Sequence, residues 1–370
     1  MIGKLWKHRK DLLAWVWHKR IKPKFWRFVR VPEMDWDFGH NLYAFHLWGK
    51  FINPRERDLE IADAEVVMQN VFETLGSGPI DLREMNWHKD FKSGKVWPLV
   101  PTESIDYLGL GDSSDVKMLW ELSRLHQTWW LGKAFWITKD KSYAKKWQSL
   151  VEDWIEHNPI GMGVNWAVSM EVAIRACNWI VGARYFRDYL PKTFWNKFYR
   201  HLYLHGLWIE YHLEFGLPRG NHFLANVMGL VALGALFSGT RKGDIWYRWG
   251  TRQLEREMRY QVYQDGVFTE GSTAYHRYAT EMFLVAAMVV RCRHNTLTQE
   301  FHVRLQKMFY FIQQMTRPDG TMAMFGDDDS GNVFKTEIGM YPHRWPMIFG
   351  EGRTKFGEVS HPDQMLGISI

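Results

Sequence analysis

The stretch Gly220-Asn221-His222-Phe223-Leu224-Ala225-Asn226 indicates the fold most clearly, because it joins polar side chains to the start of a long apolar run. The run continues to Phe237, too short to span a bilayer comfortably, and predicts a buried helix. Pro218 ends any helix before it. Polar groups at the mouth of a buried helix need protein partners or a ligand, so Asn221 and His222 are candidate site residues.

A second polar and aromatic junction follows about fifty residues later. Glu270-Gly271-Ser272-Thr273-Ala274-Tyr275-His276 leads into the apolar segment 282–290. Two loop-to-helix junctions that each carry Asn, His or Tyr predict one cleft bordered by the starts of two helices.

Helical patterns dominate the chain. No strand-like alternation stands out before residue 320, and residues 79–112 are expected to be irregular. After Gly320 the composition changes, which predicts the start of a β region. The fold class is therefore all-α, a bundle or toroid of paired helices. The expected helices are 61–75, 115–137, 141–157, 167–190, 193–213, 222–237, 244–263, 273–293 and 299–316.

Positive charge is concentrated at the N-terminus. Residues 1–30 carry ten Lys or Arg against Asp11 alone, a net +9, so the rest of the chain carries −3 of the total +6. This distribution argues against a body that binds nucleic acid. The arm also holds four tryptophans and lacks the apolar core of a signal peptide. Two interpretations stay open: a peripheral contact of residues 1–30 with an anionic membrane, or a helix that packs one Trp face on the body. A cytoplasmic, membrane-associated location is expected first, and a periplasmic one second.

No metal or cofactor is expected. Cys177 and Cys292 both lie in apolar helical segments and form no disulfide framework. The acidic loop 327–329 lacks the length and the Glu of a calcium loop. The chain has no phosphate-binding glycine loop, no HExxH and no GxSxG.

Two further polar groups lie on apolar helices. Glu171, Arg175 and Asn178 share one face, since they are four and three residues apart. They form either a buried Glu171–Arg175 pair or, with Asn165 and Trp166, a contact to a sugar or carboxylate. Glu121, Arg124 and His126 likewise form a packing network or a rim of the same cleft.

Taken in order, these motifs resemble the heparinase II/III-like polysaccharide lyases over roughly residues 60–335. That resemblance implies an (α/α) toroid followed by a C-terminal β-sandwich. It divides the chain into a basic Trp-rich arm (1–58), an incomplete toroid (59–335) and the start of a truncated β region (336–370). The motifs that carry it are Asn86-Trp87-His88-Lys89-Asp90, Trp120-Glu121-Leu122-Ser123-Arg124, Asn165-Trp166, Glu171-Val172-Ala173-Ile174-Arg175, Gly220-Asn221-His222, Tyr275-His276 and Phe325-Gly326-Asp327.

The resemblance also implies a reaction, β-elimination in an acidic, uronate-containing polysaccharide. Asn221, helped by His222, would bind the uronate carboxylate and stabilise the enolate. Tyr275 would act as base, acid or both, and the base role needs a cationic neighbour: His222, His276 or Arg175. Some family members take a further His from the β-sandwich. The residues expected to bind substrate are Glu121, Arg124, His126, Asn165, Trp166, Glu171, Arg175, Glu270 and His276.

Two alternative functions from other protein classes remain open. An inverting glycoside hydrolase would need two carboxylates roughly 6.5–9.5 Å apart, with Glu171, Asp265, Glu270 and Asp327 as candidates. A non-catalytic glycan-binding or assembly protein is favoured by the basic arm and by the incomplete β-sandwich.

Overall fold

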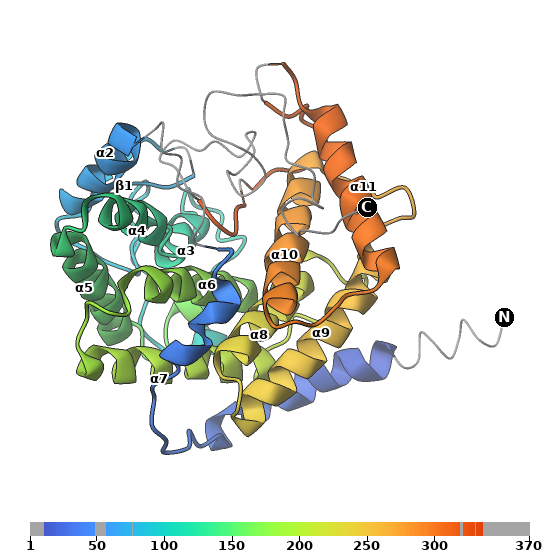
Figure 1. The fold of residues 1–370 in the computed structure, drawn as a ribbon, viewed down its shortest axis with the longest axis horizontal. Coiled ribbons are helices and arrows are strands. Elements are labelled where there is room, and N and C mark those ends of the chain that lie inside the picture. Colours follow the sequence, from blue (N-terminus) through green and yellow to red (C-terminus); the bar gives the residue numbers. More distant parts are fainter. Residues whose placement is uncertain (1–10, 49–56, 76, 319–320, 330, 336–370) are drawn as a thin grey trace.

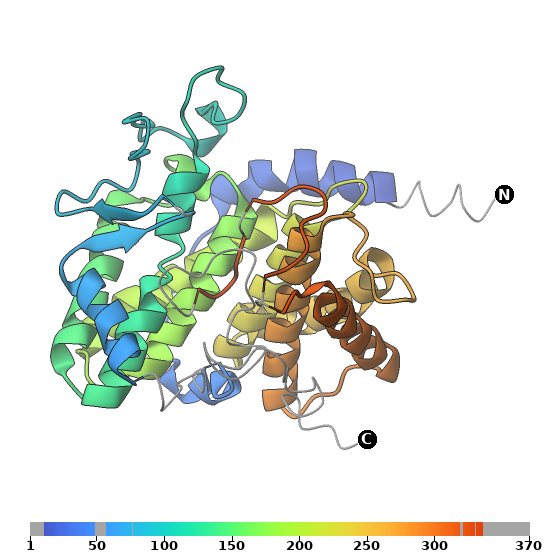
Figure 2. The ribbon, with the colours of Figure 1, turned by 90° about the horizontal axis from the view of Figure 1, so that it is seen from above.

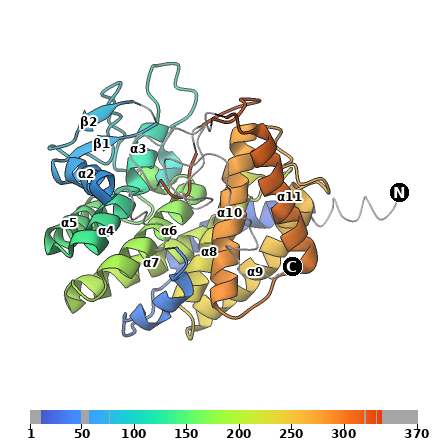
Figure 3. The same ribbon diagram turned by 45° about the horizontal axis from the view of Figure 1, so that its top comes forward.

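Most of the chain folds into antiparallel helix pairs that follow one another across the molecule (Figure 1). The computed structural model describes residues 11–48, 57–75, 77–318, 321–329 and 331–335. Figure 3 shows the succession from α4 and α5 at one end to α10 and α11 at the other, the open arc expected of an incomplete toroid. The longer helices are α2 (Arg57–Met68), α4 (Gln127–Thr138), α5 (Lys141–His157), α6 (Ser169–Phe186), α7 (Lys192–Tyr211), α8 (Asn221–Leu236), α9 (Arg241–Gln261), α10 (Thr273–Cys292) and α11 (Gln299–Met315).

Short elements connect and cover these helices. Two strands, β1 (Val71–Glu73) and β2 (Pro79–Asp81), pair antiparallel. The short helices are η1 (Trp17–Ile21), η2 (Lys22–Phe28), η3 (Gly39–Phe45), η5 (Thr102–Ser104), α3 (Lys117–Ser123) and η6 (Val164–Trp166). None of the helices in the described part of the chain is long and apolar enough to cross a membrane.

Local chemistry explains several helix boundaries. The side chains of Asp140, Thr240, Ser272 and Thr298 each accept a backbone N–H at the start of the helix that follows. For α5 the predicted range is confirmed.

Two predicted helices differ most from the structure, and the helix predicted over 167–190 ends four residues early, at Phe186. The helix expected over 115–137 is split into α3 and α4, because Leu125 takes a left-handed backbone conformation with φ 57°. The helix expected over 61–75 ends at Met68, and Asn70 with φ 60° turns the chain into β1. The expectation of no strand before residue 320 therefore fails at the β1–β2 hairpin.

Helix α8 lies at the centre of the arrangement and is buried along its whole length except at His222. Glycines allow its neighbours to approach closely. A Cβ at Gly234 would lie 2.3 Å from the backbone nitrogen of Tyr247 on α9, and one at Gly229 would lie 2.6 Å from the Cβ of Ala173 on α6. The apolar run after Asn221 is thus the core helix that its composition predicts.

The second half of the N-terminal arm is part of this core. Trp36, Phe38, Phe45 and Trp48 are buried. Helix η3 contacts α6, α8 and α10. Residues 36–48 therefore belong physically with the toroid, although the predicted arm extends to residue 58.

The chain returns to the core near its C-terminal end. Residues 331–335, here called the C-terminal strap, run between α3, α6 and α10, and Asn332, Val333, Phe334 and Lys335 are all buried. Among the described residues after 320, pairing is limited to an isolated bridge between Thr316 and Met322. The predicted β region at 336–370 lies outside the described residues.

Candidate active site

The two polar helix starts meet through Glu270. Its carboxylate accepts hydrogen bonds from the backbone nitrogen of Asn221 at 2.6 Å and from Asn221 Nδ2 at 2.7 Å. This contact confirms that the α8 and α10 junctions lie together. Asn221 is buried, and its Oδ1 has no hydrogen-bond partner in the described part of the protein. Oδ1 can only accept a hydrogen bond, so an anionic ligand could be bound only by the second N–H of Nδ2, beside the one that Nδ2 donates to Glu270.

His222 is held by a carboxylate that the sequence did not single out. Its Nδ1 lies 2.8 Å from Glu214 Oε1, so this nitrogen donates and Nε2 is left for another partner. Burial opposes the charged form, but Glu214 raises the pKa of His222 above its ordinary value. Glu214 is itself fixed, because it also accepts the backbone N–H of Met170 at 2.7 Å. Glu214 thus favours the protonated form of the imidazole beside Asn221.

Tyr275 faces an acidic partner rather than a basic one. Its hydroxyl donates to Asp329 Oδ2 at 2.5 Å, and Asp329 also pairs with Lys117. Burial and the Asp329 carboxylate raise the pKa of Tyr275 far above its ordinary value, which keeps the side chain a neutral phenol. In this arrangement Tyr275 is suited to donate a proton and poorly suited to remove one.

The side chains around Asn221 reach solvent. They are here called the surface group and comprise Lys117, Glu214, Asn221, His222, Glu270, Tyr275 and Asp329. The side chains of His222 and Asp329 are 48% and 39% exposed, and Glu270 is also exposed. Lys117 and His222 supply the positive charges, while Glu214, Glu270 and Asp329 supply the negative ones. Lys117 and His222 are each paired with one of these carboxylates, Asp329 and Glu214 respectively.

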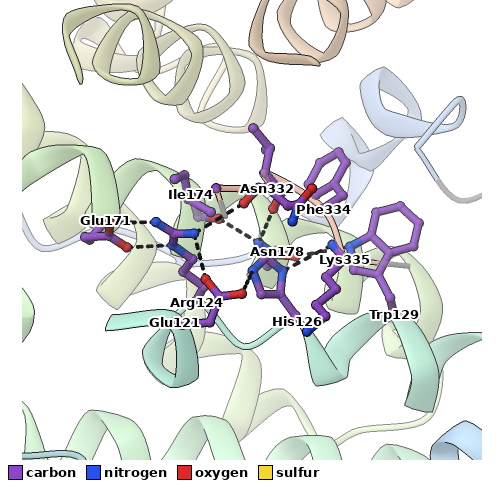
Figure 4. A network of polar contacts seen from close by, with 12 residues as sticks. Glu121, Arg124, His126, Trp129, Glu171, Ile174, Asn178, Asn332, Phe334 and Lys335 are labelled. Atoms are coloured by element: carbon purple, nitrogen blue, oxygen red, sulfur yellow. Dashed lines mark hydrogen bonds and ion pairs between the residues drawn. The ribbon is translucent and has the colours of Figure 1, made fainter. Parts of the chain in front are cut away.

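A second polar cluster lies in the interior (Figure 4). Arg124 binds Glu171 in a bidentate manner, with Nε–Oε2 and Nη2–Oε1 distances of 2.7 Å, and donates to Glu121 at 2.7 Å. Burial opposes ionisation of Glu121, yet Arg124 and His126 lower its pKa to about 2. The expected Glu171–Arg175 pair is thus replaced by Glu171–Arg124, which forms across two helices.

This interior cluster fastens the C-terminal strap. Asn178 Nδ2 donates to the carbonyl of Val333 at 2.9 Å, and His126 Nδ1 accepts the N–H of Lys335 at 3.3 Å. The carboxylate of Glu281 accepts the N–H groups of Val333 and Phe334 at 3.0 and 2.9 Å. Glu121, Arg124, His126 and Glu171 are all buried and bind one another or the strap. Their expected contact with substrate stays a prediction.

Arg175 lies in an aromatic box. Its guanidinium carbon is 4.1 Å from the Trp154 ring centroid and 5.1 Å from that of Trp166, and its Nε donates to His205 at 3.0 Å. Burial lowers the pKa of Arg175 to about 9, so it remains charged at neutral pH. Asn165 is fully buried and bonds to Trp87, Ser123 and Asn158. The structure does not bring Asn165, Trp166 or Arg175 to the Asn221 surface.

His276 is also internal, although it adjoins Tyr275. Its Nδ1 accepts the N–H of Phe268 at 3.1 Å, and its Nε2 contacts the carbonyl of Met308 at 3.0 Å. It therefore braces the Phe268 turn against α11. Of the three cationic neighbours proposed for Tyr275, only His222 lies in the surface group.

The described residues contain no group of three or more His, Cys, Asp or Glu side chains that could hold a metal ion. Cys177 and Cys292 are buried, free thiols.

Comparison with known proteins identifies the family of the chain. The model of the heparinase II/III N-terminus matches residues 52–350. The chain belongs to the heparinase II/III family. It is 25% identical over 259 residues to a heparin-sulfate lyase of Bacteroides stercoris, covering 64% of this chain and 38% of that protein. It is 26% identical over 286 residues to a heparin-sulfate lyase of Pedobacter heparinus, covering 72% of this chain and 38% of that protein. The chain thus spans well under half the length of these curated relatives.

Solved structures of heparinases share the fold. A crystal structure of heparinase III superposes with a TM-score of 0.55 at 18% identity, over 83% of this chain and 44% of that one. The heparan sulfate lyase of Pedobacter heparinus gives a TM-score of 0.53 at 20% identity, over the same shares of the two chains. The all-α, incomplete toroid predicted for this heparinase II/III-like chain is confirmed.

Three residues of the surface group were missed as site residues. Lys117 and Asp329 lie 212 positions apart, and only the fold joins them. Glu214 stands just before the Pro218 break, where a polar residue is commonplace in a loop. A search of each helix-breaking loop for a carboxylate able to reach an adjacent histidine would have found Glu214.

Proposed function

We propose that this chain is the helical part of a lyase that cleaves a uronate-containing polysaccharide by β-elimination. The observation that carries the proposal is the joining of Asn221 and His222 to the Tyr275 junction through Glu270, on a chain whose relatives are named heparin-sulfate lyases. Because the chain spans 38% of those relatives, the activity and the acidic polysaccharide substrate are both parts of the proposal.

Removal of the C5 proton of a uronate leaves charge on its carboxylate, which must be neutralised. The second N–H of the Asn221 amide and a protonated His222 would bind that carboxylate and stabilise the enolate. One such preorganised donor is typically worth about 3 kcal/mol in the transition state. Glu270 orients the Asn221 amide by binding its Nδ2.

Bond cleavage then needs a proton for the departing oxygen. The electron pair of the C5–H bond becomes the C4–C5 double bond, the C4–O bond breaks, and Tyr275 gives its phenolic proton to the glycosidic oxygen. The raised pKa of Tyr275 keeps this proton in place until the oxygen departs. We assign the removal of the C5 proton to no described residue; the family resemblance places a further His for some members in the β-sandwich.

The proposal is tested by incubating the chain with a panel of uronic-acid polysaccharides and following far-ultraviolet absorbance. A rise marks the unsaturated uronide that only elimination creates, and Tyr275→Phe should remove that rise. New reducing ends without a rise would replace the proposal with the hydrolase. Binding without either product, repeated with a β-sandwich attached, would replace it with the glycan-binding or assembly role.

The hydrolase has less to support it at this surface. Glu171, one of its four candidate carboxylates, is buried against Arg124, and Glu270 is bound to Asn221. Of the four candidate carboxylates, only those of Asp265 and Asp327 are not bound to Arg124 or Asn221.

A further inference from the structure

The N-terminal segment has two faces of different character. Residues 11–28 form a continuous helical rod at the edge of the helical body, visible in Figures 1 and 2. We propose that the outer face of this rod docks the protein on an anionic lipid bilayer. The proposal rests on this surface alone and is independent of the proposed lyase activity.

The inner face of the rod is fixed to the body. The His18 ring stacks on Phe215 with centroids 5.6 Å apart, and Trp26 packs edge-on against Trp208 at 5.0 Å. Asp11, the one acidic residue of the segment, lies on this side, 4.0 Å from Arg219. The rod is therefore held in one rotational orientation, so its other face is presented in a defined direction.

The outer face carries an apolar stripe that the protein leaves in water. Leu13, Trp17, Ile21 and Phe25 recur every four residues along the rod. Six exposed large apolar side chains in eighteen residues are denser than the single exposed residues of an ordinary surface. The stripe consists of Leu12 (53% exposed), Leu13 (62%), Trp17 (47%), Ile21 (39%), Phe25 (52%) and Phe28 (80%).

Basic side chains flank the stripe. Lys19, Arg20 and Lys24 are all exposed, and no acidic side chain of residues 11–28 faces outward, since Asp11 faces the body. Apolar side chains bordered by Lys and Arg are the pattern of helices that lie in the interface of an anionic membrane. A second copy of the chain fits less well, because two such faces would bring like charges together.

Docking in this orientation has a consequence for the candidate site. Phe215, which His18 contacts, is adjacent in sequence to Glu214, which holds His222. The loop between α7 and α8 therefore connects the membrane-facing rod directly to the site, and a bilayer would lie on the side of the body to which that loop is fixed.

The test is co-sedimentation of the full chain with vesicles of phosphatidylcholine, alone or mixed with phosphatidylglycerol. We expect binding to the mixed vesicles that weakens as salt is raised. Combined Lys19→Glu, Arg20→Glu and Lys24→Glu should weaken the partition coefficient on the order of 100-fold, at about 1 kcal/mol for each basic residue. Trp17→Glu with Phe25→Glu should abolish binding.

Matched controls use exposed residues elsewhere. Lys141→Glu, Lys145→Glu and Lys192→Glu change the net charge equally, and Val303→Glu with Tyr310→Glu replaces exposed apolar residues of α11. Both controls should bind vesicles like the unmodified chain, and circular dichroism should show all variants folded. Binding lost equally in the controls, or absent from phosphatidylglycerol vesicles, would overturn the proposal. A dimer abolished by Trp17→Glu with Phe25→Glu, without vesicle binding, would make the stripe an interface between copies.

Discussion

The interior cluster around Arg124 and the surface group around Asn221 look alike in sequence, yet they differ in what surrounds them. Both combine carboxylates, a His and a cation near helix ends. In the interior, Arg124, Glu121 and Glu171 satisfy one another and bind the C-terminal strap. At the surface, Asn221 and His222 retain hydrogen-bonding atoms without a protein partner in the described residues. Access to solvent, rather than residue type, separates the two groups: His222 and Asp329 are exposed, whereas Arg124, Glu121 and Glu171 are buried.

The largest expected effect tests the surface group. Tyr275→Phe removes the phenolic proton and should lower kcat for elimination by roughly 10²–10⁴-fold, the usual contribution of a general acid. The free energy of unfolding should change by less than about 1 kcal/mol, since a single, partly exposed hydrogen bond to Asp329 is lost. Steady-state absorbance assays and urea unfolding measure the two quantities.

Tyr310→Phe is the control for that change, because Tyr310 is exposed on α11. It should leave both quantities unchanged. A Tyr275→Phe variant with full activity would remove Tyr275 from the mechanism.

The next effect tests the interior cluster. Arg124→Ala leaves Glu121 and Glu171 buried without their cation and should lower the free energy of unfolding by about 3–5 kcal/mol. The surface control Arg259→Ala, which removes an exposed arginine 3.7 Å from Glu255, should cost less than about 1 kcal/mol. Equal losses in chemical unfolding would mean that the interior cluster has no special structural role.

The sequence predicted the helical body better than it predicted which polar residues lie in the interior cluster and which lie in the surface group. The range of α5 follows from its Asp140 cap and its apolar spacing, which are local features. The partner of Glu171 is not local. Arg175 lies one turn away on the same helix, but Arg124, 47 positions earlier, has the geometry for a bidentate pair. A same-face pattern shows which side chains can meet on one helix and carries no information about the helix that packs against it.

The C-terminal strap could not be found for the same reason. Residues 331–335 have no strand or helix pattern, and their order comes from side chains of α3, α6 and α10. The break at Leu125 is similar, because a left-handed leucine is held by tertiary contacts and has no glycine to mark it. The two helix starts at Asn221 and Tyr275, in contrast, were visible because Gly, Pro and Ser mark them in the sequence.

The pH dependence of unfolding should show whether the C-terminal strap is bound by a protonated or an ionised Glu281. Burial raises the pKa of Glu281 to about 7, against an ordinary value of 4.5. The folded protein therefore binds a proton more tightly than the unfolded chain, and this contribution to stability is present below pH 4.5 and lost as pH rises through about 7. Glu281→Gln cannot ionise, so its stability relative to the unmodified protein should improve by about 2–3 kcal/mol across that range.

The measurement for Glu281→Gln is urea unfolding of both proteins at each pH, which cancels the titration of groups that they share. Arg277 and Arg124 are the charged groups that act on this carboxylate besides the strap amides. A stability difference that stays constant with pH would show that Glu281 is ionised throughout and that the strap binds a carboxylate anion.

The smallest effect concerns Glu214, which we treat as a positioning residue because it acts on substrate only through His222. Glu214→Gln keeps a hydrogen-bond acceptor but removes the charge that raises the pKa of His222. A lower pKa reduces the protonated fraction of His222 at every pH above it. We therefore expect the alkaline limb of the kcat/KM profile to move to lower pH, with activity retained below it. Glu210→Gln is the matched control, since Glu210 binds Lys242 and Trp246 near the end of α7, four residues before Glu214. A uniform loss of activity at every pH would instead assign Glu214 to holding the loop between α7 and α8, and would leave the charge on the carboxylate-binding histidine without a role.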